Sequence, residues 1–411
     1  MSLPEVLRNR SLVGYLAGVV LSQIGTRGAM AASLYQVYDL TGSIGMTGLV
    51  GAASGLAVLV LSPIGGALAD RLDRKRLLQG AQLVGGSVAL GLAVITFTGT
   101  VEAWHVVLAS LLSMGATTFD NPTRNALIGS MVPRHQLPQA FALVNPAREV
   151  AVLVGPGLAG LLIAYGGPGL VHAVDAATYA SMVVILVFIK APSPHRDRTH
   201  APILRSILEG AQYVAGRPII MMLMSLDLSA MVFGAYRVLL PALALDVLGV
   251  GPEGYGLLAA APSAGALLAT YGIVRLVGRT QTAGRVALRA TGAFAVADLA
   301  LAHSPWFVVS LVAAACLGGA DALATCIRHA AVQIETPDEL RGRVSSIYQI
   351  SSRGGPAAGD AVMGGAAVLL GPALALTLGA GLTLSYVATL LLTPNAVREY
   401  AGPERDVVPA G

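Results

Sequence analysis

The sequence predicts an all-α membrane protein in which twelve transmembrane helices form two pseudo-symmetric six-helix bundles. Three observations carry this prediction: the composition, the number of long apolar stretches, and a set of matching residues in the two halves. The 411 residues are 55% hydrophobic and only 12% charged, whereas an ordinary soluble domain carries about 25% charged residues. A chain with so few charges needs lipid around most of its surface.

A spanning helix needs about 20 mostly apolar residues, and twelve stretches meet this requirement. The first is too long and lacks the cleavage site of a signal peptide, so we interpret it as a transmembrane helix. The expected spans are 11–38, 44–68, 77–98, 104–131, 138–164, 169–190, 218–241, 253–277, 285–302, 305–333, 343–369 and 372–392.

The loop charges predict the orientation, because cytoplasmic loops carry the excess of Lys and Arg. With the N-terminus in the cytoplasm, the outer loops hold only the acidic residues Asp39, Glu102, Asp246 and Glu253. This asymmetry predicts both termini in the cytoplasm of a bacterium, with the chain in its inner membrane. It also explains the net charge of +4 without a nucleic-acid partner. The basic residues on the cytoplasmic side are Arg8, Arg10, Arg71, Arg74, Lys75, Arg76, Arg134, Lys190, Arg196, Arg198, Arg205, Arg217, Arg279, Arg341, Arg343, Arg398 and Arg405.

A polar stretch in mid-chain divides two halves with matching residues. Adding 204 to the residue number maps Arg124 to Arg328 and Gly167 to Gly371, and adding 207 maps Gly42 to Gly249. The apolar period within Ile203–Ala215 predicts a short amphipathic helix at the membrane surface. We therefore expect a first bundle at 1–190, a cytoplasmic linker at 191–217, a second bundle at 218–393 and a cytoplasmic tail at 394–411. Parallel six-helix repeats are typical of transporters with a site between the halves.

Two motifs connect the chain to a family. Between the second and third spans, Gly66, Leu68, Ala69, Asp70, Arg71, Arg74 and Lys75 match Gly-x-Leu-Ala-Asp-Arg-x-Gly-Arg-Lys, with Asp73 in place of the second Gly. In the fifth span, Gly155, Pro156 and Gly160 match Gly-Pro-x-x-Gly-Gly, with Ala159 in place of one Gly. The sequence therefore resembles the major facilitator superfamily over nearly its whole length.

Further stretches narrow the resemblance to one branch. Residues 145–149, 237–244, 336–343 and 359–361 are similar to the branch that exports siderophores such as enterobactin and includes macrolide efflux pumps. This resemblance implies export of small natural products, with multidrug efflux and antibiotic resistance among the expected roles.

The resemblance also implies an inner gate. In the family, the carboxylate at the position of Asp70 meets the N-terminus of the eleventh helix and a nearby arginine, which suits a negative charge at a helix N-terminus. We expect Gly66, Asp70, Arg71 and Arg74 to take part, with Arg124 or Arg148 completing the latch. The alternative is that the basic residues of this loop only orient the chain. In the fifth span, Gly155, Pro156 and Gly160 are expected to allow bending and close packing.

Charged residues inside the spans are candidates for transport, because a charge in mid-bilayer is costly and should face a cavity or a partner. A buried carboxylate can carry a proton, and we favour Asp227 first and Glu149 second for this role. The alternative is that carboxylates and arginines pair only to hold helices together. The resemblance implies that helices 1, 4, 7 and 10 line the cavity, where Arg27 is a hypothesis for binding an anionic substrate such as a catecholate. The expected cavity residues are Arg27, Asp120, Arg148, Asp321 and Arg353.

The function predicted from these features is proton-coupled export of a small amphipathic compound, such as a siderophore or antibiotic, by alternating access. An alternative is a facilitator or proton-coupled importer of a small nutrient, and a more distant one is a membrane-embedded enzyme or sensor. The sequence lacks the Gly-x-x-x-x-Gly-Lys loop of ATP-binding proteins and any nucleophile–base or metal-ligand pattern. We therefore expect no enzymatic activity and no cofactor. The expected partners are the substrate, protons and the lipid bilayer, and we expect a monomer.

Overall fold

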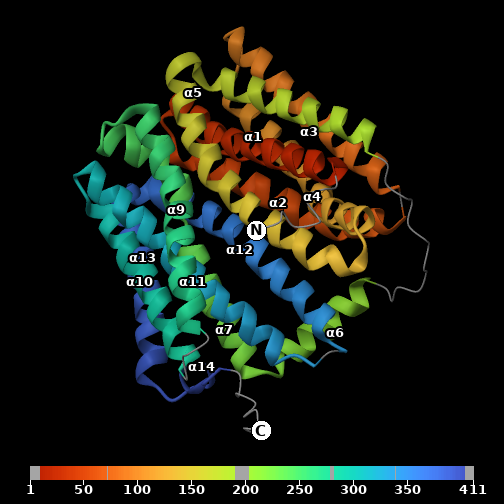
Figure 1. The fold of residues 1–411 in the computed structure, drawn as a ribbon. Coiled ribbons are helices and arrows are strands. Elements are labelled where there is room, and N and C mark those ends of the chain that lie inside the picture. The colour runs from red at the N-terminus through yellow and green to blue at the C-terminus, as the bar shows by residue number, and fades with distance from the viewer. Residues whose placement is uncertain (1–9, 72, 190–202, 278–281, 338, 403–411) are drawn as a thin grey trace. The chain divides into compact units, whose positions relative to one another are not determined.

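A computed structural model describes residues 10–71, 73–189, 203–277, 282–337 and 339–402. The described ranges are mostly helical, with short connections between the helices, and contain no strand (Figure 1). The first half holds α1 (Arg10–Thr41), α2 (Ile44–Arg71), α3 (Arg74–Phe97), α4 (Ala103–Met131), the 3-10 turn η2 (Arg134–Gln136) and α5 (Leu137–Phe188). The remainder holds α6 (Ile203–Ala215), α7 (Pro218–Phe233), the 3-10 turn η3 (Tyr236–Leu239), α8 (Leu240–Ala242), the π-turn η4 (Leu243–Val247), α9 (Gly251–Val277), α10 (Ala283–His303), α11 (Phe307–Ile334), α12 (Arg341–Leu370), α13 (Pro372–Leu392) and α14 (Ala396–Glu399).

Helical segments occupy all twelve predicted spans, so the all-α fold class is confirmed. Seven described stretches are long and apolar enough to cross a membrane by length and composition alone. These are Ile44–Leu61, Arg74–Phe97, Leu137–Phe188, Pro218–Val247, Ala283–His303, Phe307–Ile334 and Pro372–Leu392.

Three spans differ in detail from the prediction. The fifth and sixth spans form one continuous helix, α5, interrupted by non-helical backbone at Gly166 and Gly167. The seventh span breaks after Phe233, where Gly234 ends α7 and short turns continue the path. A side chain at Gly234 would clash with the Phe294 ring and with the Ala230 carbonyl, so close packing requires glycine at this break.

Backbone geometry supports the internal repeat. Gly42 and Gly249, which the repeat aligns, have φ angles of 60° and 61°. The aligned pair Gly167 and Gly371 have φ angles of 73° and 80°. Positive φ is readily adopted only by glycine, so the same turns recur at the same positions of both halves.

The chain divides into two compact units, and unit 1 contains residues 1–199, 237–260 and 360–372. Its core joins α1, α3, α4 and α5 through buried apolar side chains that include Tyr15, Leu78, Leu127 and Met182. Burial of such side chains contributes about 1.5–3 kcal/mol each.

Two segments from the second half of the sequence belong to unit 1 and pack on first-half helices. We call this set of contacts the seam. Thr47 Oγ1 donates to the Val238 carbonyl at 2.7 Å, and the Tyr255 hydroxyl donates to the Ala31 carbonyl at 2.8 Å. At two helix crossings, a glycine of one helix faces a glycine of the other. A side chain on Gly364 would reach Gly48 Cα at 2.6 Å, and a side chain on Gly256 would reach Gly160 Cα at 2.7 Å.

Unit 2 contains residues 200–236, 261–359 and 373–411. Its core includes Leu223, Leu226, Leu288 and Val387 from α7, α10 and α13. The short helix expected at 203–215 is α6, and it packs within this unit. Tyr213 donates to the Glu335 carbonyl at 3.0 Å, and Glu209 pairs with Arg343 at 2.6 Å.

Asp73, which stands where the family pattern has Gly, is the N-cap of α3. Its φ angle is −61°, and its carboxylate accepts the backbone N–H of Arg76 at 2.9 Å. An N-cap aspartate satisfies one of the amides at a helix start. The turn therefore tolerates Asp without the positive φ that would demand glycine.

Candidate functional site

Two arginines of unit 1 lie within electrostatic range of a third, Arg27, and we call the three the arginine cluster. Arg27 on α1 interacts electrostatically with Arg148 on α5 and with Arg237 on η3, and also with Glu149. Arg237 is in turn within range of the Asp360 carboxylate on α12. Like charges repel strongly where water is scarce, so this arrangement favours an anion nearby.

The local sequence explains how Arg27 reaches this position. A side chain at Gly155 would meet Arg27 Cβ at 2.7 Å and the Ile24 carbonyl at 2.8 Å, so Gly155 allows α5 to cross α1 closely. Gly160 lies five residues further along α5. A side chain added there would meet the Pro252 carbonyl at 2.6 Å. The glycines of the fifth-span motif thus provide close crossings on both sides of α5, whereas the helix remains regular at Pro156.

A buried polar network adjoins the arginine cluster. Arg124 Nε pairs with Asp120 Oδ1 at 2.6 Å on the same face of α4, one helical turn apart. Gln82 donates to the same carboxylate at 3.1 Å, and Arg124 also donates to Ser22 Oγ at 3.2 Å. Arg148 lies within electrostatic range of Asp120, which connects the network to the cluster.

Unit 2 contains a second buried arginine, at the position that the repeat aligns with Arg124. Arg328 Nη2 lies 2.5 Å from Asp227 Oδ1 on α7 and 3.6 Å from Asp321 Oδ1 on its own helix. It also donates to Thr325 Oγ1 at 2.7 Å. Asp227 is buried, whereas the Asp321 side chain is 45% exposed. We call Asp227, Asp321 and Arg328 the two-carboxylate cluster.

The two arginine sites differ in charge. In unit 1, Arg124 pairs with one carboxylate, and the pair is neutral. In unit 2, Arg328 is shared by two carboxylates, so the cluster carries one net negative charge when both are ionised. One bound proton would neutralise it.

The predicted residues are therefore divided between several places. Arg27, Asp120 and Arg148 are brought together in unit 1, while Asp227 and Asp321 meet in unit 2. Glu149 is exposed, and Arg124 pairs with Asp120. The structure does not describe the surroundings of Gly66 or the side chains of Asp70, Arg71 and Arg353. The latch, including Arg74, therefore stays a prediction.

Sequence reasoning missed Arg237 and Asp360 as members of the arginine cluster, and it noted Arg328 only as a repeat match. The signal for Arg237 was present, because an arginine inside a predicted span is itself unusual. The pairing of Arg328 with Asp227 depends on two helices about a hundred residues apart in the sequence. In the described residues, no group of His, Cys, Asp or Glu could hold a metal ion.

Buried charged residues inside membrane-spanning helices are typical of secondary transporters. A family model places this one in the major facilitator superfamily. The family model for transmembrane secretion effectors matches residues 8–405, and the chain belongs to this family. It is a multi-pass membrane protein and not an enzyme.

Curated relatives and solved structures agree with this assignment. The enterobactin exporter EntS of Escherichia coli O1:K1 is 27% identical over 361 residues, covering 87% of this chain and 85% of that protein. EntS of Shigella boydii serotype 4 is 26% identical over the same length. Among structures, a mutant of the nucleoside transporter NupG aligns with a TM-score of 0.77 at 14% identity, covering 92% of this chain and 98% of that one. A bacterial homologue of the iron transporter ferroportin, in an inward-facing state, aligns with a TM-score of 0.71 at 15% identity, covering 94% and 97%.

Proposed function

We propose that this protein is a proton-coupled exporter of an anionic amphipathic compound, such as a catecholate siderophore or an acidic antibiotic. It works by alternating access in the inner membrane of a bacterium, with both termini in the cytoplasm. The observation that carries the proposal is the arginine cluster of Arg27, Arg148 and Arg237 in unit 1. The relatives that export enterobactin support the same chemistry.

The arginine cluster suits an anionic ligand for physical reasons. Arginine keeps its charge inside the membrane and offers planar, bidentate contacts to carboxylates and similar oxyanions. Glu149 lies within electrostatic range of Arg27 and Asp360 lies within range of Arg237, so two acidic groups share this neighbourhood with the three arginines. A bound anion would interact with the same guanidinium groups, so its affinity should depend on Arg27 and Arg237.

The two-carboxylate cluster is our choice for proton coupling. Because Asp227 and Asp321 share Arg328, only one of them is fully neutralised by it. Two carboxylates that share a site repel each other, and a proton bound to the cluster would relieve this repulsion. Asp321 is the more exposed of the two, so it is the member of the cluster that water reaches. Asp227 remains the first candidate for the proton carrier and Glu149 the second.

The proposal is tested in inverted membrane vesicles with an internal pH-sensitive dye. Enterobactin is the trial substrate, and a neutral macrolide is the comparison compound. Arg27→Gln and Arg237→Gln are expected to raise the apparent KM for enterobactin at least tenfold and to change that of the macrolide little. Arg289→Gln, on the exposed face of α10, is the matched control.

Proton coupling is measured in the same vesicles. Asp321→Asn and Asp227→Asn are expected to abolish substrate-dependent proton release, whereas Arg289→Gln should retain it. Substrate uptake that proceeds without any proton movement in wild type would contradict coupling and favour the facilitator. Inward accumulation in whole cells would favour the importer.

The latch is part of the same proposal. Asp70, with Arg71 and Arg74 beside it, closes the cytoplasmic side in one state of the cycle, and Gly66 allows the turn to approach closely. Asp70→Asn is expected to slow transport while leaving enterobactin binding unchanged, as measured by isothermal titration calorimetry. Equal loss of binding and transport would count against a gating role.

A further inference from the structure

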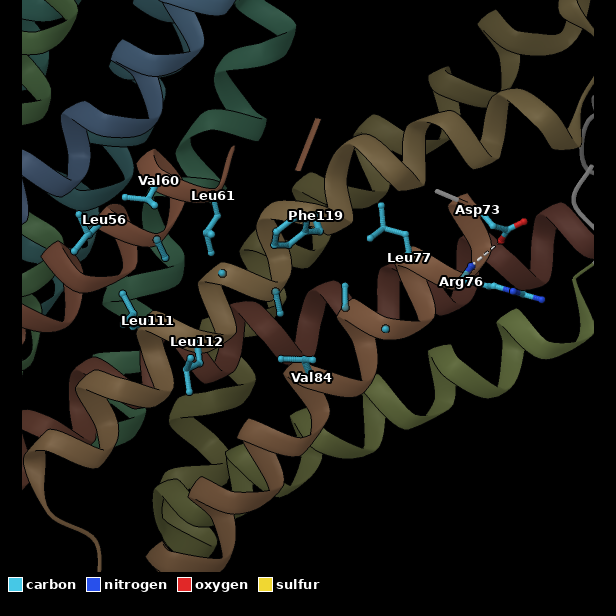
Figure 2. A pocket seen from close by; sticks show the side chains of 15 residues that line it. Leu56, Val60, Leu61, Asp73, Arg76, Leu77, Val84, Leu111, Leu112 and Phe119 are labelled. Atoms are coloured by element: carbon cyan, nitrogen blue, oxygen red, sulfur yellow. Dashed lines mark hydrogen bonds between the residues drawn. The ribbon is translucent and has the colours of Figure 1, made fainter. Parts of the chain in front are cut away.

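Helices α2, α3 and α4 of unit 1 form an apolar groove of about 830 Å³. Figure 2 shows leucine, valine and phenylalanine side chains from the three helices converging on it. It is separate from the arginine cluster and shares no residue with it. The lining residues are Leu56, Ala57, Val60, Leu61, Asp73, Arg76, Leu77, Gly80, Ala81, Val84, Leu111, Leu112, Gly115, Ala116 and Phe119.

Large apolar side chains around the groove are exposed. Leu56 on α2 is 56% exposed and Val84 on α3 is 53% exposed. Both lie in stretches long and apolar enough to cross a membrane. Exposure of such side chains to water would be costly, so hydrocarbon covers this groove in the bilayer.

One end of the groove is charged. Figure 2 shows Asp73 and Arg76 together at this end, where α3 begins. The Asp73 carboxylate caps α3 by accepting the Arg76 backbone N–H, while the Arg76 side chain is exposed. The first turn of α3 is Arg74, Lys75 and Arg76. The positive end of the helix dipole adds to these charges and favours a negative group.

The α3 side of the groove is slightly shorter than one leaflet of the bilayer. Along α3, the lining runs from Arg76 to Val84, which corresponds to about 12 Å at the rise of an α-helix. Half of the hydrocarbon core is about 15 Å. A chain that starts with its headgroup at Arg76 would therefore cover the α3 side of the groove within its own leaflet.

We propose that this groove binds one acyl chain of an anionic phospholipid, whose phosphate is held at Arg76. The cation at the charged end distinguishes anionic from zwitterionic lipid, because basic residues at the membrane surface attract anionic headgroups. An acyl chain in the groove contacts α2, α3 and α4 together on this face of unit 1.

A glycine in the groove allows a clean test of chain binding. A side chain added at Gly80 would meet no atom within 4 Å, and the same is true of Gly91 on the same helix. Gly80 lines the groove, whereas Gly91 does not. Gly80→Leu therefore fills the groove, and Gly91→Leu is the matched control. After purification from membranes of phosphatidylglycerol and phosphatidylcholine, native mass spectrometry is expected to show retained phosphatidylglycerol on wild type and Gly91→Leu, and at least a fivefold loss on Gly80→Leu.

The headgroup is tested with a second pair of variants. Arg76→Gln should abolish the preference for phosphatidylglycerol over phosphatidylcholine. Arg285→Gln is the control, because Arg285 is also the third residue of its helix, α10, and is exposed. Equal lipid retention in Gly80→Leu and Gly91→Leu would overturn the proposal, as would a lipid preference that survives Arg76→Gln. If Gly80→Leu instead weakened enterobactin transport with lipid retention unchanged, the groove would be a substrate site and the lipid assignment would be wrong.

Discussion

At the scale of single residues, the second half of the protein depends on one buried arginine. Arg328 is almost fully buried and contacts both Asp227 and Asp321. A buried ion pair is a weak source of net stability, but loss of one partner leaves the other charge uncompensated. Arg328 is therefore expected to matter for the stability of unit 2, apart from the role in proton coupling that we propose for its cluster.

Replacing Arg328 is expected to destabilise unit 2. Arg328→Gln should cost about 3–5 kcal/mol, because Asp227 would remain buried as an unpaired carboxylate. Adding Asp227→Asn to this variant should restore part of the lost stability. Thermal unfolding in detergent measures both effects, with Arg289→Gln as the exposed control. A melting temperature unchanged by Arg328→Gln would show that the pair is not structurally important.

Asp298 on α10 is a buried carboxyl of a different kind. Its exposure is 0%, and neither carboxylate oxygen has a hydrogen-bond partner among the described residues. Burial of a charged group without a partner is expensive. Asp298→Asn, which removes the ionisable group at nearly constant size, is therefore expected to raise the melting temperature. A fall of several degrees would mean that Asp298 makes a stabilising contact that asparagine does not reproduce.

At the scale of elements, glycines determine where the long helices break or cross. Gly167 interrupts α5 with a φ of 73° and ψ of 176°, a conformation open almost only to glycine. At Gly234, where α7 ends, the Phe294 ring occupies the space that a side chain would need. A hydrophobicity pattern does not distinguish such glycines from those that only pack in a regular helix.

The kink in α5 gives a prediction with an internal control. No atom lies within 4 Å of a side chain added at Gly167 or at Gly91. A clash with neighbouring residues therefore plays no part in either change. Gly167→Ala is expected to lower stability by about 1–3 kcal/mol, because alanine strains the backbone there. Gly91→Ala, in the regular helix α3, should be neutral or stabilising. Similar melting temperatures for the two variants would contradict a strained position.

At the scale of the whole molecule, the seam ties distant parts of the sequence together. It joins α1, α2 and α5 to residues 237–260 and 360–372 inside unit 1. The glycine pairs Gly48–Gly364 and Gly160–Gly256 bring helix backbones into contact. Alternating access requires contacts of this kind to form and separate, so we expect the seam to be one of the moving contacts.

Blocking the seam is expected to stop transport without unfolding the protein. In Gly256→Val the added atoms would meet the Gly160 backbone at 2.7 Å and the Pro156 carbonyl at 2.8 Å. We expect at least a tenfold loss of enterobactin export in vesicles. Gly381→Val, where no neighbour lies within 4 Å, is the control. Size-exclusion chromatography checks that both variants fold, and full activity of a folded Gly256→Val variant would exclude the seam from the cycle.

The sequence was enough to predict several of the residues that belong to the candidate site, because charged residues are rare inside membrane spans. Arg27, Asp120, Arg148, Asp227 and Asp321 stood out because a charge within an apolar span is costly. Their grouping was not predictable. Arg237 comes within electrostatic range of Arg27 because the chain enters unit 1 at residue 237, after the break that ends α7.

By itself, the sequence determined the class of this protein: an all-helical membrane transporter with a repeated half and a loop pattern of its superfamily. These features follow from composition and from local periodicity, which each stretch of chain carries independently of the others. Only the tertiary structure decided that Arg328 is shared by two carboxylates and that Arg148 and Arg237 come within electrostatic range of Arg27 in unit 1. The physical reason is that ion pairing and packing depend on distances between helices far apart in the sequence, and no local pattern encodes those distances.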